Sequence, residues 1–156
     1  TSVLLAAALK IGACLAGASE EDQQRLYDFG EKMGLAFQLQ DDWLDVYGDP
    51  AVFGKNIGGD ILCNKKTYML ITALEQADGR QRAELEKYLT STICEPSEKI
   101  AAVTALYNEM GIGNRCQEKI KALYDEGLAV FAQIGLPDEQ KKELKDFVCG
   151  LMERNL

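Results

Sequence analysis

The sequence predicts an all-α fold of about six to seven helices, in a single domain over residues 1–156. Three observations support this prediction. Apolar residues recur every three or four positions along most of the chain, no segment alternates between apolar and polar residues, and only three prolines occur. With 156 residues, of which 47% are hydrophobic and 27% charged, the chain has the length and balance of one globular domain.

The first two expected helices occupy the first third of the chain. The first helix covers residues 2–16, ends at Gly17 and is apolar nearly all round. Such a helix must be buried on every side, so we expect it to need neighbouring helices that this chain alone does not supply. Ser19 has the features of an N-cap, because three acidic residues follow it in the first turn. The second helix then runs to about Val46.

A glycine-rich loop over residues 47–59 separates these helices from the rest. A third helix is expected to start near Asp60 or Ile61 and to run to about Ala77, where Asp78-Gly79 marks a turn. The remaining helices are expected at residues 80–91, 97–110, 114–133 and 138–154.

Composition narrows the possible functions. The net charge of −8 disfavours a nucleic-acid partner. The sequence has no histidine, so it cannot form a Ser-His or Cys-His nucleophile. Its five cysteines are widely spaced, and we expect buried free thiols in a reducing cytoplasm. The apolar stretch 1–17 is too short to span a bilayer and contains Lys10, so we expect no stable membrane insertion.

The most informative segment, residues 37–67, reads FQLQDDWLDVYGDPAVFGKNIGGDILCNKKT. Asp41 and Asp45 are four residues apart and therefore share one helix face with Gln38, whereas Asp42 is rotated by about 100°. Like charges at this spacing destabilise a helix by about 0.2–0.5 kcal/mol. A bound Mg²⁺ would explain them, because this ion binds carboxylate oxygens. The alternative is a solvated acidic face at a helix C-terminus, where carboxylates oppose the helix dipole.

The residues that follow favour a binding site. Lys55 and Lys65 come after the acids, and lysines provide point charges for phosphate oxygens. Asp60 is either a further metal ligand or the N-cap of the next helix. Lys66 is expected to be exposed to solvent. Together these residues predict a site in which carboxylates bind a metal and lysines bind a diphosphate.

The segment resembles the second aspartate-rich region of trans-isoprenyl diphosphate synthases, such as the farnesyl and geranylgeranyl diphosphate synthases. Thr1 is similarly placed to the threonine of a Lys-Thr pair that begins a helix in that family. The resemblance implies the C-terminal half of an isoprenoid synthase helical bundle. The family elements FQxxDDxxD, GDP, GK, GxD and NK occur in order as Phe37-Gln38, Asp41-Asp42-Trp43-Leu44-Asp45, Gly48-Asp49-Pro50, Gly54-Lys55, Gly59-Asp60 and Asn64-Lys65.

The resemblance also implies residue roles. Asp41, with Asp42 and Asp45 in support, corresponds to the ligands of a Mg²⁺ cofactor. Lys55 and Lys65 correspond to residues that contact the diphosphate and assist its departure.

Four further residues take roles by the same resemblance. Gln38 corresponds to a residue near the developing allylic cation. Thr1 is expected to be a catalytic residue. Phe37 and Asp60 are expected to contribute to substrate binding, although a place in the core explains Phe37 equally well.

The implied reaction is a prenyl transfer in which an allylic diphosphate condenses with isopentenyl diphosphate. The chain lacks the family's first DDxxD motif, so we expect it to be inactive alone and to associate with the missing N-terminal half or form a homodimer. Three alternatives stay open: a non-catalytic helical subunit that pairs with a catalytic partner, a class I terpene cyclase fragment, and an unrelated helical interaction module. DDxxD at this position, in place of the cyclases' usual Asn/Asp-Ser/Thr-Glu triad, disfavours a cyclase.

Overall fold

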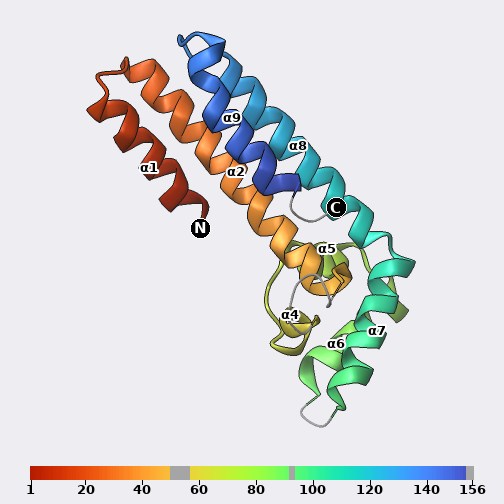
Figure 1. The fold of residues 1–156 in the computed structure, drawn as a ribbon. Coiled ribbons are helices and arrows are strands. Elements are labelled where there is room, and N and C mark those ends of the chain that lie inside the picture. The colour runs from red at the N-terminus through yellow and green to blue at the C-terminus, as the bar shows by residue number, and fades with distance from the viewer. Residues whose placement is uncertain (50–56, 92–93, 154–156) are drawn as a thin grey trace. The chain divides into compact units, whose positions relative to one another are not determined.

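The computed structural model describes residues 1–49, 57–91 and 94–153 (Figure 1). These residues form helices and no strand, which confirms the predicted all-α class. The helices within the described ranges are α1 (Ser2–Leu15), α2 (Glu20–Tyr47), α4 (Gly59–Leu62), α5 (Tyr68–Gln76), α6 (Gly79–Thr90), α7 (Pro96–Glu109), α8 (Ile112–Ala132) and α9 (Asp138–Glu153).

By their internal contacts the helices divide into two compact units. The first unit combines Thr1–Gln38 with Lys119–Leu156, and the second unit is Leu39–Glu118. Both α2 and α8 contribute residues to each unit. The organisation of residues 1–156 as one domain stays a prediction.

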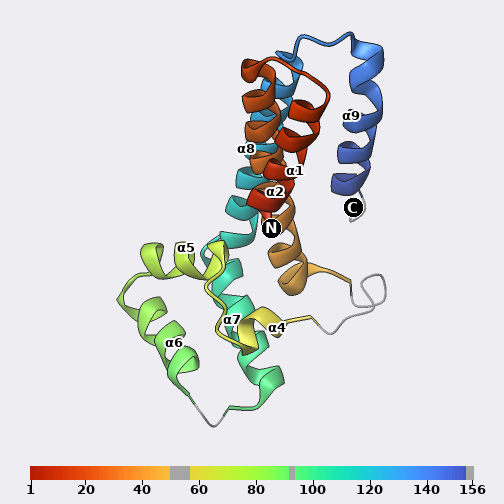
Figure 2. The same ribbon diagram turned by 90° about the vertical axis from the view of Figure 1, so that its left-hand side faces the viewer.

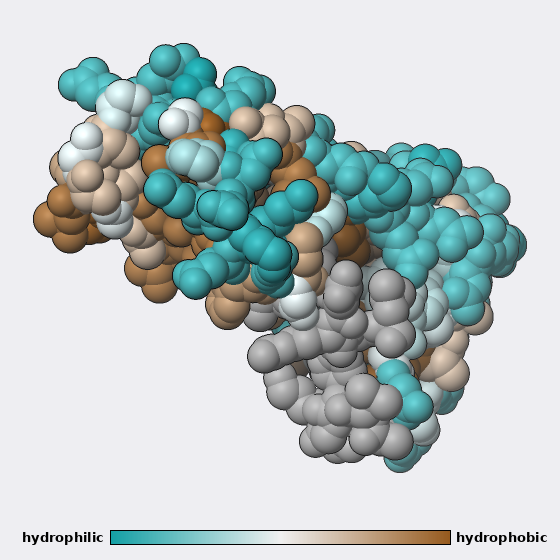
Figure 3. Space-filling model, turned by 45° about the horizontal axis from the view of Figure 1, so that its top comes forward, coloured by the Kyte–Doolittle hydropathy of each residue, from teal (hydrophilic) through white to brown (hydrophobic). Residues whose placement is uncertain are grey.

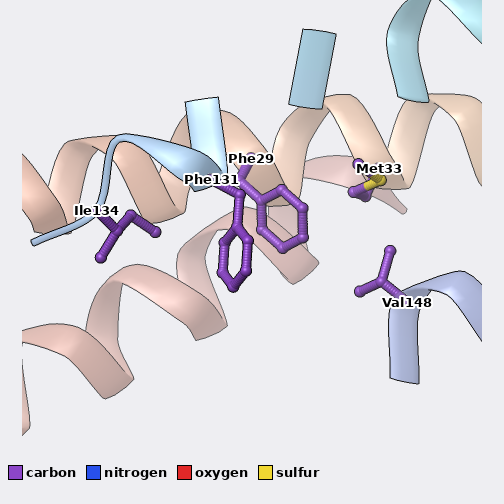
Figure 4. Packing of buried hydrophobic residues seen from close by; sticks show 5 residues of the cluster. All are labelled: Phe29, Met33, Phe131, Ile134 and Val148. Atoms are coloured by element: carbon purple, nitrogen blue, oxygen red, sulfur yellow. The ribbon is translucent and has the colours of Figure 1, made fainter. Parts of the chain in front are cut away.

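The core of the first unit is a cluster of apolar side chains from α2, α8 and α9 (Figure 4). Phe29 is fully buried, and its ring centroid lies 4.6 Å from that of Phe131. Met33, one turn further along α2, points toward Val148. Phe29 and Met33 belong to the helical repeat expected from the sequence, so the repeat correctly identifies the buried face of α2.

A close approach of α1 and α2 also stabilises the first unit. Gly34 of α2 lies against the backbone of Ser2, where an added Cβ would come within 2.5 Å of the Ser2 Cα. Glycine is therefore required at this position for the two helices to be in contact. The face of α1 that packs on α2 includes Ala6, which is fully buried.

The opposite face of α1 is apolar and exposed, which agrees with the expectation that this helix needs neighbouring helices that the chain alone does not supply. The side chains of Val3, Leu4 and Leu15 are 60%, 78% and 84% exposed. Figure 3 shows hydrophobic surface at the edge where Figure 1 places α1. Within the described ranges, no helix is both long and apolar enough to cross a membrane.

In the second unit, α7 contacts both α4 and α6 (Figure 2). Helix α6 begins with a capping box, in which the Asp78 side chain accepts a hydrogen bond from the Gln81 N–H and the Gln81 side chain accepts one from the Asp78 N–H. Helix α7 begins at Pro96, which needs no partner for a missing N–H in the first turn. The core of this unit includes Met69, Leu85, Val103, Leu106, Ile112 and Cys116.

The single helix predicted from Asp60 to Ala77 is interrupted in the structure. Helix α4 ends at Leu62 and α5 begins at Tyr68. Between them Asn64 adopts a left-handed backbone with φ of 53°, and Thr67 caps α5 by accepting a hydrogen bond from the Leu70 N–H. This break presents Lys65 outside any helix.

The cysteines are free, as expected, but the expectation that they are buried is wrong for most of them. Cys116 is the buried one, whereas Cys14 and Cys63 are exposed. Burial, followed by the nearby negative charge of Asp42, raises the pKa of the Cys116 thiol to about 12.

This difference in burial predicts selective thiol chemistry. At pH 8.5 we expect an aromatic disulfide reagent to modify Cys14 and Cys63 quickly. Cys116 should react on the order of 1,000-fold more slowly, because few thiolates form at its raised pKa and the reagent cannot reach it. Mass spectrometry of labelled peptides, with and without urea, checks this result. Labelling of Cys116 at the rate of Cys63 in the folded protein would contradict it.

Candidate metal and diphosphate site

Three aspartates lie in the last two turns of α2, and they differ in environment. Asp41 is exposed, Asp42 is buried and Asp45 is half-buried. No basic residue lies in the last turn of α2 to offset its C-terminal dipole. The negative charge at this end must therefore be balanced from elsewhere.

Lys65 balances part of this charge. Its ammonium lies 2.8 Å from Asp42 Oδ1 and 2.7 Å from Asp60 Oδ2, so it joins α2 to α4. Burial lowers the pKa of Lys65, but the hydrogen bonds that its ammonium donates to Asp42 and Asp60 outweigh this effect and raise the pKa above its usual value. The pKa of Asp60 is raised, first by burial and then by the charges of Asp45 and Asp42, against the opposing effect of Lys65. Among the described residues, Lys65 is the cation that pairs with these carboxylates, so negative charge predominates in this part of the site.

Asp45 organises the start of α4. Its Oδ2 accepts a hydrogen bond from the Asp60 N–H at 2.8 Å, and its backbone carbonyl accepts one from the Gly58 N–H at 2.5 Å. Gly58 has φ of 88°, and a Cβ there would come within 2.5 Å of Ile100 Cδ1. Only glycine meets both conditions without strain. Gly58, and not Asp60, occupies the N-cap position of α4, so the N-cap interpretation of Asp60 is wrong.

The other predicted site residues lie elsewhere. Thr1 and Gln38 belong to the first unit, where the Thr1 hydroxyl donates a hydrogen bond to Gln38 Oε1 at 3.1 Å. Phe37 borders an apolar cavity of about 340 Å³ formed by α1, α2 and α9. Lys55 lies outside the described residues, and Lys66 is exposed as expected.

The donors present are chemically suitable for Mg²⁺, because aspartate oxygens are the hard ligands that this ion prefers. Asp41 presents its carboxylate to solvent, and Asp42, Asp45 and Asp60 concentrate negative charge nearby. In the described part of the chain, no three acidic or cysteine side chains converge in a way that would hold a metal by themselves. The fit therefore rests on the chemistry of the carboxylates together with ligands from a bound diphosphate.

Two residues that the sequence did not single out support this arrangement. Asn64, noted only as part of a motif, bridges neighbouring helices: its Nδ2 donates to the Leu89 carbonyl at 3.0 Å. Lys99 of α7 is buried, and its ammonium donates to Asn64 Oδ1 at 2.6 Å. Lys99 stands in a polar run that begins a helix, so no sequence signal indicated its burial.

Comparison with known proteins identifies the family to which the chain belongs. The sequence model of the polyprenyl synthetase family matches residues 1–110, which is more than half of the chain. The chain belongs to the polyprenyl synthetase family. Its residues from the aspartates of α2 to Lys65 lie within this match.

Similarity to individual proteins supports the assignment to this family. A (2E,6E)-farnesyl diphosphate synthase of Mycobacterium tuberculosis is 32% identical over 157 residues, which cover 99% of this chain and 44% of the relative. A crystal structure of a geranylgeranyl pyrophosphate synthase superposes with a TM-score of 0.88 at 37% identity, covering 100% of this chain and 49% of the other. A geranylgeranyl pyrophosphate synthase from Corynebacterium glutamicum, solved with isoprenyl diphosphate and magnesium, gives a TM-score of 0.78 at 31% identity and covers 92% and 41%.

These polyprenyl synthetases are about twice as long as the chain. The chain spans about half the length of the relatives that it matches. The relatives are named as farnesyl diphosphate and geranylgeranyl pyrophosphate synthases, and the all-α fold of the chain is that of the solved structures.

Proposed function

We propose that the chain provides the second aspartate-rich half of a Mg²⁺-dependent isoprenyl diphosphate synthase, which condenses an allylic diphosphate with isopentenyl diphosphate. The observation that carries this proposal is the cluster formed by Asp42, Asp60 and Lys65 within a family match. A relative at 31% identity was solved with isoprenyl diphosphate and magnesium, which supports the same ligands here.

Each site residue would have a distinct role in this reaction. Asp41 would hold Mg²⁺ with support from Asp42 and Asp45, and the ion would neutralise charge on the diphosphate. Lys65 places a second positive charge where the leaving group departs. Lys55, outside the described residues, is proposed to do the same. Thr1 and Gln38, which are hydrogen-bonded to one another, would face the allylic portion of the substrate.

The reaction is balanced without a side-chain base. The allylic C–O bond breaks and diphosphate leaves with the electron pair. The allylic carbon then bonds to the terminal alkene carbon of isopentenyl diphosphate. The proton lost in restoring a double bond passes to the released diphosphate. This scheme agrees with a sequence that has no histidine.

The exposed apolar face of α1 supports association with a second helical body. Val3, Leu4 and Leu15 lie on this face, and relatives have about as much chain again to cover it. We propose that the partner is the other half of the synthase fold, with a homodimer as the alternative. The five free cysteines support a cytoplasmic location.

A hybrid enzyme tests the proposed function. We expect the chain alone to form no elongated product. Co-expression with the half of the Mycobacterium tuberculosis farnesyl diphosphate synthase that it does not match should give a co-eluting complex that incorporates radiolabelled isopentenyl diphosphate. Lys65→Met should lower turnover of the complex by about 100-fold, because one charge that stabilises the leaving group is lost.

Lys66→Met is the matched control, since Lys66 is the exposed neighbour of Lys65. It should retain turnover within about twofold. A complex that co-elutes but forms no product would overturn the catalytic proposal and favour a non-catalytic subunit.

A further inference from the structure

Lys99 is a buried cation that the proposed chemistry does not use. It lies on α7, its side chain is among the most buried polar groups of the second unit, and the residue is 7% exposed. Within the described ranges it forms no ion pair with a carboxylate. Burying an ammonium without a counter-ion is costly unless hydrogen bonds compensate for the lost water.

Among the described residues, Lys99 donates its hydrogen bonds to the segment that carries Lys65. Its Nζ donates to Asn64 Oδ1 at 2.6 Å and to the Leu62 carbonyl at 3.3 Å. The Leu62 carbonyl is the last of α4 and has no partner within that helix, so the Lys99 ammonium satisfies it. Lys99 therefore holds both the end of α4 and the residue directly before Lys65.

The contacts of the Asn64 side chain fix the backbone conformation at this residue. It has a left-handed conformation, which costs energy for a non-glycine residue unless its surroundings fix it. Its side chain is held from both sides, by Lys99 through Oδ1 and by the Leu89 carbonyl through Nδ2. The next residue, Lys65, then directs its ammonium to Asp42 and Asp60.

A water-sized cavity of about 10 Å³ lies between these groups and is lined by Asp42, Asp60, Asn64, Lys65 and Lys99 among others. Both lysines thus border the same small space within the second unit. A lysine side chain loses much rotamer freedom when it is held in one conformation. The backbone that carries Lys65 must therefore be fixed if its ammonium is to stay at the carboxylates.

We propose that Lys99 is a positioning residue, which acts through Asn64 to hold Lys65 at the carboxylates. This role deepens the proposed function, because Lys65 is the residue assigned there to the diphosphate. Lys99 and Asn64 hold Lys65 in the absence of any ligand, so this role can be tested separately from the binding of Mg²⁺-diphosphate.

The ligand-free test uses NMR spectra that correlate Lys Nζ with its protons, since hydrogen-bonded ammonium groups exchange slowly with water. Lys65→Met and Lys99→Met assign the two signals. We expect Lys99→Met to remove its own signal and also to broaden the Lys65 signal beyond detection. Lys87→Met, an exposed lysine of α6, is the matched control and should leave the Lys65 signal unchanged.

A second variant covers the case in which Lys99→Met does not fold. Asn64→Gly keeps the left-handed backbone accessible but removes the acceptor of Lys99. We expect it to abolish the Lys65 signal too. A folded variant of either kind that retains the wild-type Lys65 signal would overturn the proposal.

Affinity for Mg²⁺-diphosphate, measured by calorimetry, supplies a readout that a merely structural role would not produce. We expect Lys99→Met and Asn64→Gly each to weaken binding about tenfold, as loss of an outer support does at metal sites. Because one acts through the other, the double variant should be no weaker than either single variant. Additive losses would overturn the proposal. If the wild-type chain binds no Mg²⁺-diphosphate, the titration is repeated on its complex with the other half of the synthase fold. Absence of binding there too would overturn the proposed function, while the NMR comparison still decides the role of Lys99.

Discussion

Replacing Phe29 by alanine is expected to lower the free energy of unfolding by about 3–5 kcal/mol. Phe29 is fully buried, and its ring packs against Phe131 at the centre of the first unit. Met33 and Val148 close the same cluster, so the surrounding side chains have little freedom to fill the space that the ring leaves. The loss combines the transfer free energy of the ring with the cost of a cavity.

Urea denaturation followed by far-ultraviolet circular dichroism measures this loss. Phe147→Ala is the matched control, because Phe147 is 62% exposed on α9 and its removal should cost less than about 1 kcal/mol. Trp43 is the only tryptophan and lies in the second unit, so its fluorescence shows whether that unit keeps its own midpoint. A change below 1 kcal/mol in Phe29→Ala would contradict the assignment of the core.

Local signals in the sequence predicted most helix ends. Ser19 was expected to cap the second helix, and its hydroxyl accepts a hydrogen bond from the Asp22 N–H at 3.1 Å. The end of the second helix at Val46 lies one residue from the observed Tyr47, and α9 begins at Asp138 as expected. These features depend on residues three or four apart, which is the range that helical periodicity describes.

The break between α4 and α5 could not be predicted in this way. Asn64 adopts its conformation because Leu89 and Lys99, 25 and 35 residues away, bind its side chain. Such contacts depend on tertiary packing, which overrides local propensity. The apolar character of Ile61 and Leu62 and of the residues after Thr67 suggested a continuous helix.

The composition of the candidate site was predictable, but its internal contacts were not. The order of acids and lysines indicated that Asp42, Asp60 and Lys65 belong together, and they form one ion-pair network. The sequence did not indicate that Asp45 binds the backbone of Asp60. The sequence also did not predict the burial of Lys99, because in a polar segment nothing distinguishes a buried lysine from an exposed one.

Replacing Asp41 by alanine is expected to weaken binding of Mg²⁺-diphosphate by about 100-fold or more, since loss of outer-shell groups alone costs about 10- to 100-fold. Asp41 is the most informative of the three aspartates to change. It is exposed, so its removal should leave the fold intact. In contrast, Asp42 is buried against Lys65 and Asp45 holds the start of α4, so their substitution would disturb structure and binding together.

Calorimetric titration of Mg²⁺-diphosphate into the wild-type chain and into Asp41→Ala measures the difference. Asp28→Ala is the control, because Asp28 lies on the same helix and contacts Gln24 far from the site. We expect binding to require Mg²⁺, to be unchanged in Asp28→Ala and to weaken about 100-fold or more in Asp41→Ala. Equal affinity of the wild-type chain and Asp41→Ala would show that Asp41 does not hold the metal. Binding by neither protein would show that the carboxylates at the end of α2 need ligands from a facing helix, which only the other half of the synthase fold can provide.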